Sequence, residues 1–553
     1  MTASVPPASP TALPPTDPFA RARLPPPELW PELLFDLPEL QYPARLNCVA
    51  ELLDGAVAAG RGERVAIVAD GVTLTYSALL EQVDRVAHVL RGPLGLVPGN
   101  RVLLRGANCP TMAAAILGVI KAGCIAVPTM PLLRARELDA VMSKARVDAV
   151  LCARTLAGEL LAAPGVPARV LWFGAPPAGE TETETVHDDT ALETLMARQP
   201  ARYAPCDTAA DDVCLISFTS GTTGVPKGTM HFQRDLLAIC DCFPRSVLDS
   251  QPDDVFIGTP PLAFTFGLGG LLLFPLRVGA RTVLLEKATP ETLLQAIARH
   301  RATVCFTAPT FYRQMAALAP GHDLASLAKT VSAGEALPLA TRTAWRQATG
   351  LEMIDGIGAT EMLHIFISAS GDAVRPGATG KVVPGYQACI LGPDGERLGP
   401  GVIGRLAVKG PTGCRYLDDA RQRDYVFDGW NLTGDAYQMD EDGYFYYCSR
   451  TDDMIISAGY NIAGQEVEDA LLRHPAVAEC GVVGLPDEER GQVTAAYVVL
   501  RAGYTASDAL AAQLQEHVKA QIAPYKYPRA VRFLGALPRT ETGKLQRFKL
   551  RNA

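Results

Sequence analysis

Short apolar runs alternate with helical stretches between residues 60 and 310. The runs have the length of buried strands. They lie at 63–71, 101–106, 124–130, 148–153, 169–174, 280–287 and 302–309. Between them, Ser77–Leu90 and Thr111–Lys121 have helical spacing. Buried strands that alternate with helices indicate parallel sheets, so we expect an α/β fold.

The pattern changes after about residue 380 to short strands and turns. The segments 401–410 and 441–450 favour antiparallel β-structure. Beyond Asp452 the pattern predicts a compact α+β unit. Its elements are a helix (Gln465–Leu472), a strand (Val493–Leu500), a helix (Ala506–Gln521) and a strand (Ala530–Leu534). We therefore expect a flexible lead-in over 1–28, a large N-terminal domain of stacked α/β sheets plus a β subdomain over 29–451, and a small mobile C-terminal domain over 452–553.

Composition excludes several classes of protein. The 553 residues are 48% apolar and 20% charged, as in an ordinary globular chain. The formal net charge of −8 gives no sign of the basic face of a nucleic-acid-binding protein. The apolar run Pro260–Leu276 is shorter than the ~20 residues of a membrane span and is broken by Pro and Gly. Thirteen cysteines without a C-x-x-C pair are typical of reduced core residues. A cytoplasmic location follows as the expectation.

A loop rich in glycine and hydroxyl groups follows the apolar run 213–218. It reads TSGTTGVPKG from Thr219 to Gly228. Glycine lets backbone N–H groups approach phosphate oxygens, hydroxyls donate hydrogen bonds, and lysine supplies positive charge. The loop is not a Walker A motif, because Val225 rather than Lys follows Gly224. A plain surface turn is the alternative.

This loop resembles the phosphate loop of the acyl-adenylate-forming enzymes, which include acyl-CoA synthetases, peptide-synthetase adenylation domains and firefly luciferase. Further segments resemble the other motifs of that superfamily in the same order. They are LTYSAL (74–79), IKAGCIAVP (120–128), AGE (333–335), GATE (358–361), Trp430 with TGD (433–435), RTDD (450–453), and PRT (538–540) with Gly543 and Lys544. The resemblance covers the chain from about residue 45 onward.

The resemblance implies a role for each matching residue. Phosphate contacts would come from Thr219, Ser220, Gly221, Thr222, Thr223, Gly224 and Lys227. Nucleotide contacts would come from Gly334, Glu335, Asp355, Gly356, Ile357, Thr360, Asp435 and Arg450. Glu361 would hold Mg²⁺, and Lys544 would bridge the substrate carboxylate and the α-phosphate. Thr360, Glu361, Arg450 and Lys544 would thus be the catalytic group. Composition alone would make Lys544 a solvated surface lysine.

The resemblance also implies motion between two half-reactions. The C-terminal domain would rotate about Asp452, and coenzyme A would approach at Ser457, Ala458, Gly459 and Tyr460. Three positions depart from the common pattern of the superfamily. Ile357 replaces an aromatic residue beside adenine, Gly464 replaces a proline, and Arg405 replaces an acid that we interpret as structural.

The resemblance implies that the acid pocket lies between the segment after the phosphate loop and the G-x-T-E segment. Its residues would be Phe264, Thr265, Phe266, Gly267, Ala333, Gly358, His364 and Ile365. Aromatic rings, branched side chains and one polar handle suit an aromatic acid better than a long chain. Plain hydrophobic core is the alternative for Phe264, Phe266 and Ile365, and a satisfied core histidine is the alternative for His364.

The stretch 355–366 resembles benzoate-CoA ligases, and 25–54 resembles 2-aminobenzoate-CoA ligases. The resemblance therefore implies an ATP-, Mg²⁺- and coenzyme-A-dependent ligase of benzoate or 2-aminobenzoate, in which His364 or a backbone carbonyl would accept from a 2-amino group. Nine residues follow Lys544, so a free-standing ligase is expected. A medium-chain fatty-acyl-CoA synthetase, a ligase that loads a separate carrier protein, and a binding-only member are the alternatives. We expect no nucleic-acid or membrane partner, and a homodimer stays open.

Overall fold

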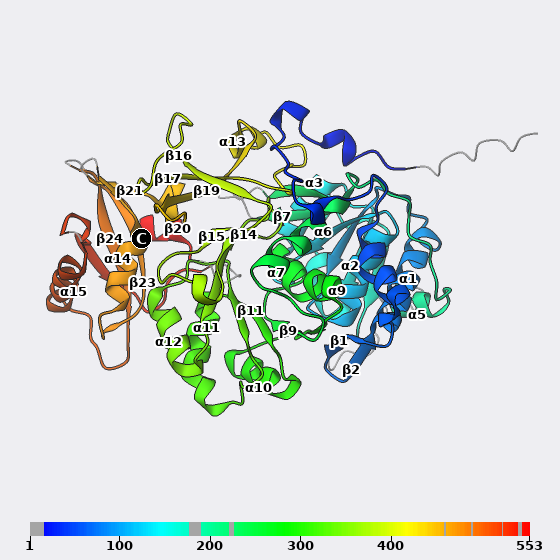
Figure 1. Ribbon diagram of the computed structural model, residues 1–553, viewed down its shortest axis with the longest axis horizontal. Coiled ribbons are helices and arrows are strands. Elements are labelled where there is room, and N and C mark those ends of the chain that lie inside the picture. The colour runs from blue at the N-terminus through cyan, green and yellow to red at the C-terminus, as the bar shows by residue number, and fades with distance from the viewer. Residues whose placement is uncertain are drawn as a thin grey trace, which may run out of the picture.

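The computed structural model describes residues 16–175, 190–219, 226–457, 460–487, 490–522, 524–539 and 545–552. In this part of the chain the strands form four sheets. Three of these sheets build a large N-terminal domain, and the fourth belongs to a smaller C-terminal domain at one end of the molecule (Figure 1). The expected mixed α/β class is confirmed.

A nine-stranded sheet forms one half of the N-terminal domain. Its central strands are parallel, and its edges end in antiparallel pairs. In spatial order the strands are β15 (Lys381–Val382), β14 (Ile365–Ser368), β13 (Met353–Gly358), β12 (Lys329–Ser332), β11 (Val304–Thr307), β9 (Val255–Gly258), β10 (Arg281–Val283), β1 (Val65–Ala69) and β2 (Val72–Thr75). The run 280–287 is a strand only over β10, because it becomes exposed from Glu286 onward.

A six-stranded sheet forms the other half of this domain. Its strands are parallel except for the last pair, which is an antiparallel hairpin. In order they are β6 (Val170–Phe173), β5 (Ala149–Ala153), β3 (Arg101–Arg105), β4 (Ile125–Thr129), β7 (Val213–Thr219) and β8 (Lys227–Phe232). The strands expected at 101–106, 124–130, 148–153 and 169–174 are all present.

Helices cover both faces of these two sheets. Val102 and Leu104 of β3 pack into the cluster between the sheets, whereas Leu103 packs into an outer cluster, because successive side chains of a strand point to opposite faces. The inner layer holds α1 (Tyr76–Arg91), α2 (Pro110–Lys121), α6 (Gln233–Asp241) and α9 (Phe274–Val278). Outside lie α3 (Ala135–Ala145) and α4 (Ala157–Leu161) on one side, and α10 (Pro290–His300), α11 (Pro309–Leu318) and α12 (Leu339–Thr349) on the other.

An antiparallel sheet completes the N-terminal domain. Its strands are β16 (Gln387–Leu391), β17 (Gly404–Lys409), β18 (Val426–Phe427), β19 (Trp430–Met439) and β20 (Phe445–Arg450). The short helices of this domain are α5 (Leu192–Ala197), α7 (Phe243–Ser246), α8 (Thr265–Leu268) and α13 (Gln422–Tyr425). The apolar run 260–276 folds into α8, a π-helical turn and α9 inside the core. No described helix is long and apolar enough to cross a membrane.

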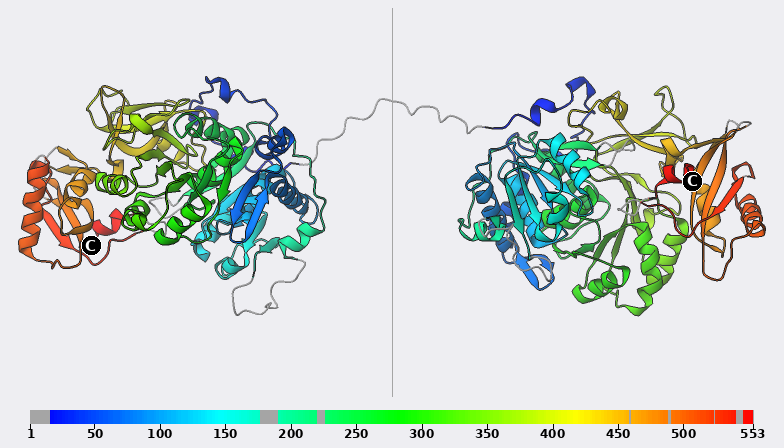
Figure 2. Two further views of the ribbon diagram at one scale, coloured as in Figure 1. Left: turned by 60° about the horizontal axis from the view of Figure 1, so that its bottom comes forward. Right: turned by 180° about the vertical axis from the view of Figure 1, so that it is seen from behind.

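The C-terminal domain has one sheet with helices packed against it (Figure 2). Its strands are β21 (Ile455–Ser457), β22 (Tyr460–Ile462), β23 (Val477–Asp487), β24 (Gly491–Leu500) and β25 (Ala530–Phe533). Its helices are α14 (Gly464–Leu472), α15 (Asp508–Gln521) and α16 (Arg547–Arg551). The predicted helix 506–521 begins at Asp508, because the Ser507 hydroxyl accepts from the Leu510 N–H at 3.2 Å and caps it.

Contacts of Asp17, Phe19 and Arg23 hold the start of the described chain in place, so the expectation of a flexible lead-in is wrong for residues 17–23. Asp17 pairs with the guanidinium group of Arg101 at 2.5 Å. Phe19 is buried, and the guanidinium carbons of Arg23 and Arg101 lie 4.1 and 4.4 Å from the centroid of its ring. The ion pair and the cation–π contacts hold this segment against the six-stranded sheet, although its Pro-rich composition is typical of a linker.

Candidate active site

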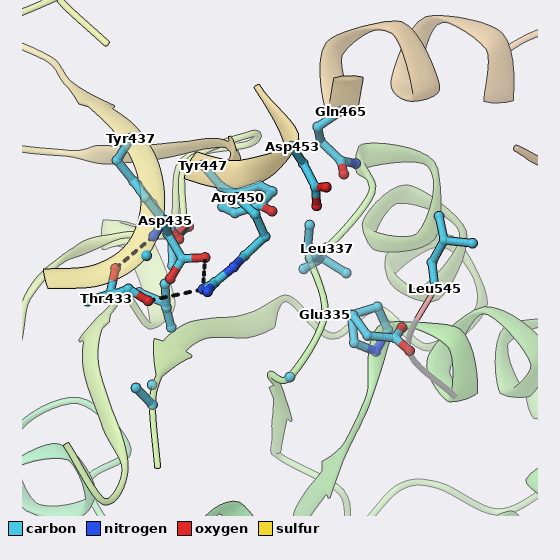
Figure 3. Close-up of a pocket in the computed structure, with 18 of the residues that line it drawn as sticks. Glu335, Leu337, Thr433, Asp435, Tyr437, Tyr447, Arg450, Asp453, Gln465 and Leu545 are labelled. Atoms are coloured by element: carbon cyan, nitrogen blue, oxygen red, sulfur yellow. Dashed lines mark hydrogen bonds and ion pairs between the residues drawn. The ribbon is translucent and has the colours of Figure 1, made fainter. Parts of the chain in front are cut away.

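A cavity of about 970 Å³ lies between the N-terminal sheets and the C-terminal domain. Figure 3 shows Thr433, Asp435 and Arg450 on one side of this cavity, and Glu335 and Leu545 on the other. The C-terminal domain contributes residues of α14 and β23 to the lining, together with Arg539, Leu545 and Arg547. The cavity therefore exists only where the two domains meet.

The ends of the expected phosphate loop open onto this cavity. The loop joins β7 to β8, and Thr219 and Lys227 lie opposite each other in the hairpin register. Both residues line the cavity. The Thr219 hydroxyl is buried and has no hydrogen-bond partner in the described part of the chain. The intervening Ser220, Gly221, Thr222, Thr223 and Gly224 lie outside the described residues.

Glu361, the expected metal carboxylate, is part of a short polar chain. It lines the cavity at 7% exposure and accepts a hydrogen bond from the Tyr416 hydroxyl. Lys227 Nζ donates to the same hydroxyl at 2.8 Å and lies 3.8 Å from Glu361 Oε1. Burial and the Glu361 carboxylate raise the pKa of the Tyr416 phenol, so it stays protonated and can donate to Glu361. The tyrosine thereby links the phosphate-loop lysine to the acid.

Asp435 and Arg450 lie opposite each other on β19 and β20. The guanidinium Nη1 of Arg450 donates to Asp435 Oδ1 and to the carbonyl oxygen of Thr433, both at 3.0 Å. Burial opposes the charge on Arg450, but the Asp435 carboxylate raises the pKa of the guanidinium above its ordinary value. Gly434 has φ of 76°, and a Cβ there would lie 2.6 Å from Arg450 Nη2. Only glycine fits between these two side chains without strain.

The expected nucleotide segments form the floor of the cavity. Gly334, Glu335, Gly356, Ile357 and Gly358 line it, as do Asp355 and Thr360. The Glu335 carboxylate accepts from the hydroxyl and the N–H of Thr310 at 2.7 and 3.3 Å, in the first turn of α11. Burial raises the pKa of Asp355 to about 7, although the Arg342 guanidinium and the Gly356 N–H oppose the rise. At neutral pH this face of the cavity thus carries a carboxyl group poised between two charge states.

Most of the expected acid-pocket residues do not line this cavity. Gly358 does, whereas Phe264, Thr265, Phe266, Gly267, Ala333, His364 and Ile365 are not part of the lining. The His364 ring is 3% exposed, and neither of its nitrogens has a hydrogen-bond partner among the described residues. Four phenylalanine rings surround it at centroid distances of 4.5 to 6.4 Å, namely Phe243, Phe266, Phe274 and Phe306. Burial lowers the pKa of His364 to about 3, so the ring is neutral.

The C-terminal part of the expected site is described only at its edges. Lys544 lies outside the described residues, as do Ala458, Gly459 and the side chains of Asp452 and Tyr460. Arg539 and Leu545, which bracket the segment with Lys544, pair as an isolated antiparallel bridge and both line the cavity. Ser457 is buried on β21 and is not part of the cavity lining.

Sequence reasoning missed several residues of this site. Tyr416, Arg313 and Glu479 stand in no motif, and no local feature distinguishes them from core or surface residues. Arg405, which we interpreted as structural, lines the cavity while its Nη2 donates to the carbonyl oxygens of Gly392 and Pro393 at 2.6 and 3.1 Å. A survey of the arginines and tyrosines near the motifs would have included Tyr416 among many others. Only the folded structure shows that Tyr416 contacts Glu361.

The residues present fit a magnesium ion. Mg²⁺ is usually held in proteins by one or two carboxylates together with substrate phosphates, and seldom by a cage of protein groups. Glu361 supplies one carboxylate beside the ends of the phosphate loop. In the described part of the chain, no group of three or more His, Cys, Asp or Glu side chains could hold a metal alone. The donor set therefore suits a metal that arrives with a nucleotide.

Family comparisons decide the class of this chain. Residues 55–415 match the AMP-binding enzyme family, and residues 466–544 match the AMP-binding enzyme C-terminal domain. The chain belongs to the AMP-binding enzyme family. The expected kinship with adenylate-forming enzymes is thus confirmed.

Two individual relatives are similar to this chain over nearly its whole length. The benzoate–CoA ligase of Thauera aromatica is 36% identical over 93% of this chain and 98% of its own. The crystal structure of the anthranilate CoA ligase AuaEII in complex with anthranoyl-AMP has a TM-score of 0.86 at 32% identity, covering 93% of this chain and 98% of its own.

MatB from Rhodopseudomonas palustris is 29% identical, over 92% of this chain and 98% of its own, and has two comparable structures. The TM-score is 0.82 for its ATP-bound form and 0.75 for its apo form. Because the MatB sequence is the same in both, this AMP-binding enzyme is closer in conformation to the ATP-bound form.

Tyr416→Phe should weaken binding of magnesium nucleotide by about tenfold. Without the hydroxyl, Lys227 can pair directly with Glu361, and that pair competes with both the metal and the phosphates. Calorimetric titration with a non-hydrolysable Mg²⁺–ATP analogue measures the change. Tyr386→Phe is the matched control, because it removes a buried hydroxyl that lies 3.3 Å from Thr412 Oγ1 and outside the cavity lining. Equal affinities of all three proteins would contradict the role of Tyr416.

The free energy of unfolding of Asp355→Asn, measured relative to that of the wild type, should increase as the pH rises. The folded-state pKa of about 7 exceeds the ordinary 3.8, so the stability that the protonated carboxyl group contributes is lost as pH rises through about 7. Asparagine stays neutral throughout. The difference in free energy of unfolding should grow by roughly 2–3 kcal/mol between about pH 5 and about pH 8. Urea unfolding followed by circular dichroism tests this, with the exposed Asp372→Asn as control; parallel pH curves for wild type and Asp355→Asn would contradict it.

Proposed function

We propose that this AMP-binding enzyme is an ATP-dependent aryl-CoA ligase. It would join benzoate or 2-aminobenzoate to AMP with release of pyrophosphate, and then pass the aryl group to coenzyme A with release of AMP. One observation carries the proposal. A single cavity is lined by both ends of the phosphate loop, by Thr360 and Glu361, by the Asp435–Arg450 pair and by the residues that bracket Lys544.

In the first half-reaction a carboxylate oxygen of the acid attacks the α-phosphorus of ATP, and the bond to the β-phosphate breaks. Lys227 and the hydroxyl of Thr219 would hold the leaving phosphates. Asp435 would accept hydrogen bonds from the ribose hydroxyls, because an ionised carboxylate is an acceptor that can serve two donors. Lys544 would lower the energy of the negative charge that develops between the acid and the α-phosphate.

Glu361 is the residue that would hold Mg²⁺. The metal supplies positive charge that stabilises the departing pyrophosphate. Tyr416 and Lys227 keep the Glu361 carboxylate turned toward the cavity before the nucleotide arrives.

In the second half-reaction the thiol sulfur of coenzyme A attacks the carbonyl carbon of aryl-AMP, and AMP leaves. Adenylation makes this possible because AMP is a far better leaving group than the oxygen of a free carboxylate. Ser457 of β21 is not part of the cavity lining in this structure. Rotation about Asp452 would remove the segment with Lys544 and bring the β21–β22 hairpin to the site.

An aromatic acid is favoured by the environment of His364 and by the relatives. Four phenylalanine rings surround the neutral imidazole of His364, which lies next to the G-x-T-E segment. Rings of this kind suit a flat aryl group, and an unprotonated imidazole nitrogen can accept from a 2-amino substituent. The similarity to a benzoate–CoA ligase and to an anthranilate CoA ligase supports the same class of substrate.

Pyrophosphate release should depend on an aryl acid. With ATP, Mg²⁺ and coenzyme A, we expect turnover with benzoate and 2-aminobenzoate, weaker turnover with 4-hydroxybenzoate and none with octanoate. Turnover with octanoate alone would keep the two-step mechanism and overturn the aromatic assignment. One equivalent of pyrophosphate per enzyme without thioester would point to a carrier protein as the acceptor.

Lys544→Ala should separate the half-reactions. Adenylation should fall by at least about 100-fold, because a positioned charge in the transition state is lost. Thioester formation from supplied benzoyl-AMP and coenzyme A should stay close to the wild-type rate. Single-turnover assays of each half measure both rates, and Lys549→Ala, a nearby exposed lysine on α16, is the control. Equal losses in both halves would contradict the role of Lys544.

A further inference from the structure

Glu479 lies on β23 where the C-terminal domain contacts α11 of the N-terminal domain. Arg313 of α11 reaches it with Nη2 at 2.8 Å from Glu479 Oε1. The same guanidinium donates through Nη1 to the carbonyl oxygen of Ala478 at 3.4 Å. The side chains of Arg313 and Glu479 are 33% and 28% exposed, so solvent only partly screens the pair. One arginine thus links the two domains through a side chain and a backbone oxygen.

The second carboxylate oxygen of Glu479 binds the segment that leads to Lys544. Arg539 Nη2 lies 2.9 Å from Glu479 Oε2. Leu545 lies opposite Arg539, and the Gln546 N–H donates to the Pro538 carbonyl oxygen at 2.9 Å. Arg539 is therefore held both by Glu479 and by the pairing with Leu545.

Helix α11 connects this contact to the nucleotide face of the cavity. Thr310, in its first turn, binds the Glu335 carboxylate through its hydroxyl and N–H. Arg313 follows three positions later, on the same side of the helix. Both Thr310 and Arg313 line the cavity, as does Glu479. A continuous series of contacts therefore runs from Glu335 through α11 and Glu479 to Arg539.

The negative charge of Glu479 offsets the repulsion between the guanidinium groups of Arg313 and Arg539. Burial raises the pKa of the Glu479 carboxyl, but Arg539 and Arg313 more than offset this, and the pKa is lowered overall. The group is therefore ionised at neutral pH and lies between two guanidinium groups. Without its negative charge the two arginines would face each other across the domain contact and repel.

We propose that Glu479 is a positioning residue for adenylation, which holds the C-terminal domain against α11 through Arg313 and holds Arg539 at the cavity. The proposal rests on the two-step function above. Because the second half-reaction needs the domain to rotate, the Arg313–Glu479 contact must break after each adenylation. The contact should therefore speed adenylation and should not speed thioester formation.

Glu479→Gln removes the charge and keeps the size of the side chain. Adenylation, measured as pyrophosphate release in a single turnover with ATP, Mg²⁺ and benzoate, should slow by about three- to tenfold. Thioester formation from supplied benzoyl-AMP and coenzyme A should be unchanged or faster. A residue that merely supports the fold would slow both halves together, so the ratio of the two rates is the decisive readout.

Two further variants complete the test. Arg313→Gln breaks the same contact from the other domain and leaves the C-terminal domain intact, so it should change the rate ratio in the same direction. The double variant should show less than the sum of the two effects in free energy, because both remove one interaction. Glu516→Gln is the control, since its 2.6 Å pair with Lys519 lies within α15 and crosses no domain contact.

Small-angle X-ray scattering of the unliganded proteins gives a readout that needs no substrate. Glu479→Gln and Arg313→Gln should shift the scattering profile in the same direction, and Glu516→Gln should match the wild type. The proposal would be overturned if both Glu479→Gln and Arg313→Gln kept the wild-type ratio of the two rates and the wild-type scattering profile. A wild type that releases no pyrophosphate with any aryl acid would instead overturn the function, and the scattering would still decide whether the contact holds the domains.

Discussion

A buried ion pair between Arg415 and Asp235 fixes the arrangement on which the rest of the site depends. Both side chains are fully buried, and a charge in that position is tolerated only with a partner of opposite sign. Asp235 also accepts from the Phe232 N–H at 2.9 Å at the start of α6, and the Arg415 carbonyl oxygen accepts from the Met230 N–H at 2.8 Å. The segment 414–416 is thereby fastened along β8. Tyr416, which follows Arg415 in this segment, consequently lies beside both Lys227 and Glu361.

Several cationic groups of the cavity contact acids of the protein, either directly or through a tyrosine. Lys227 is linked to Glu361 through Tyr416, Arg450 pairs with Asp435, and Arg313 and Arg539 share Glu479. This pairing keeps positive charge in place without leaving it uncompensated. If the cavity binds a nucleotide as proposed, the phosphates and ribose hydroxyls would replace contacts that the protein makes with itself. The first two pairs lie within the N-terminal domain, whereas the third crosses to the C-terminal domain and couples the charges to domain position.

Local sequence patterns predicted most of the secondary structure. The parallel strands of both large sheets are buried on both faces, and such strands have a strong apolar signal. Helices such as α1 and α15 begin where a Thr or Ser side chain caps them, at Thr75 and Ser507. The prediction was wrong for residues 17–23, because long-range contacts of Asp17 and Phe19 with Arg101 overrode a Pro-rich composition. Such contacts leave no trace in a short window of sequence.

The sequence by itself determined the family and the residues that match its motifs, because each motif is a short run whose chemistry is local. Tertiary structure alone decided which of these residues share a cavity and which other residues join them. Tyr416 meets Glu361 across 55 positions of the chain, and Arg313 meets Glu479 across 166. It also placed His364 among phenylalanine rings and outside the cavity lining. The reason is that charge pairing and ring packing act between surfaces, and only the folded arrangement of sheets and domains determines which surfaces meet.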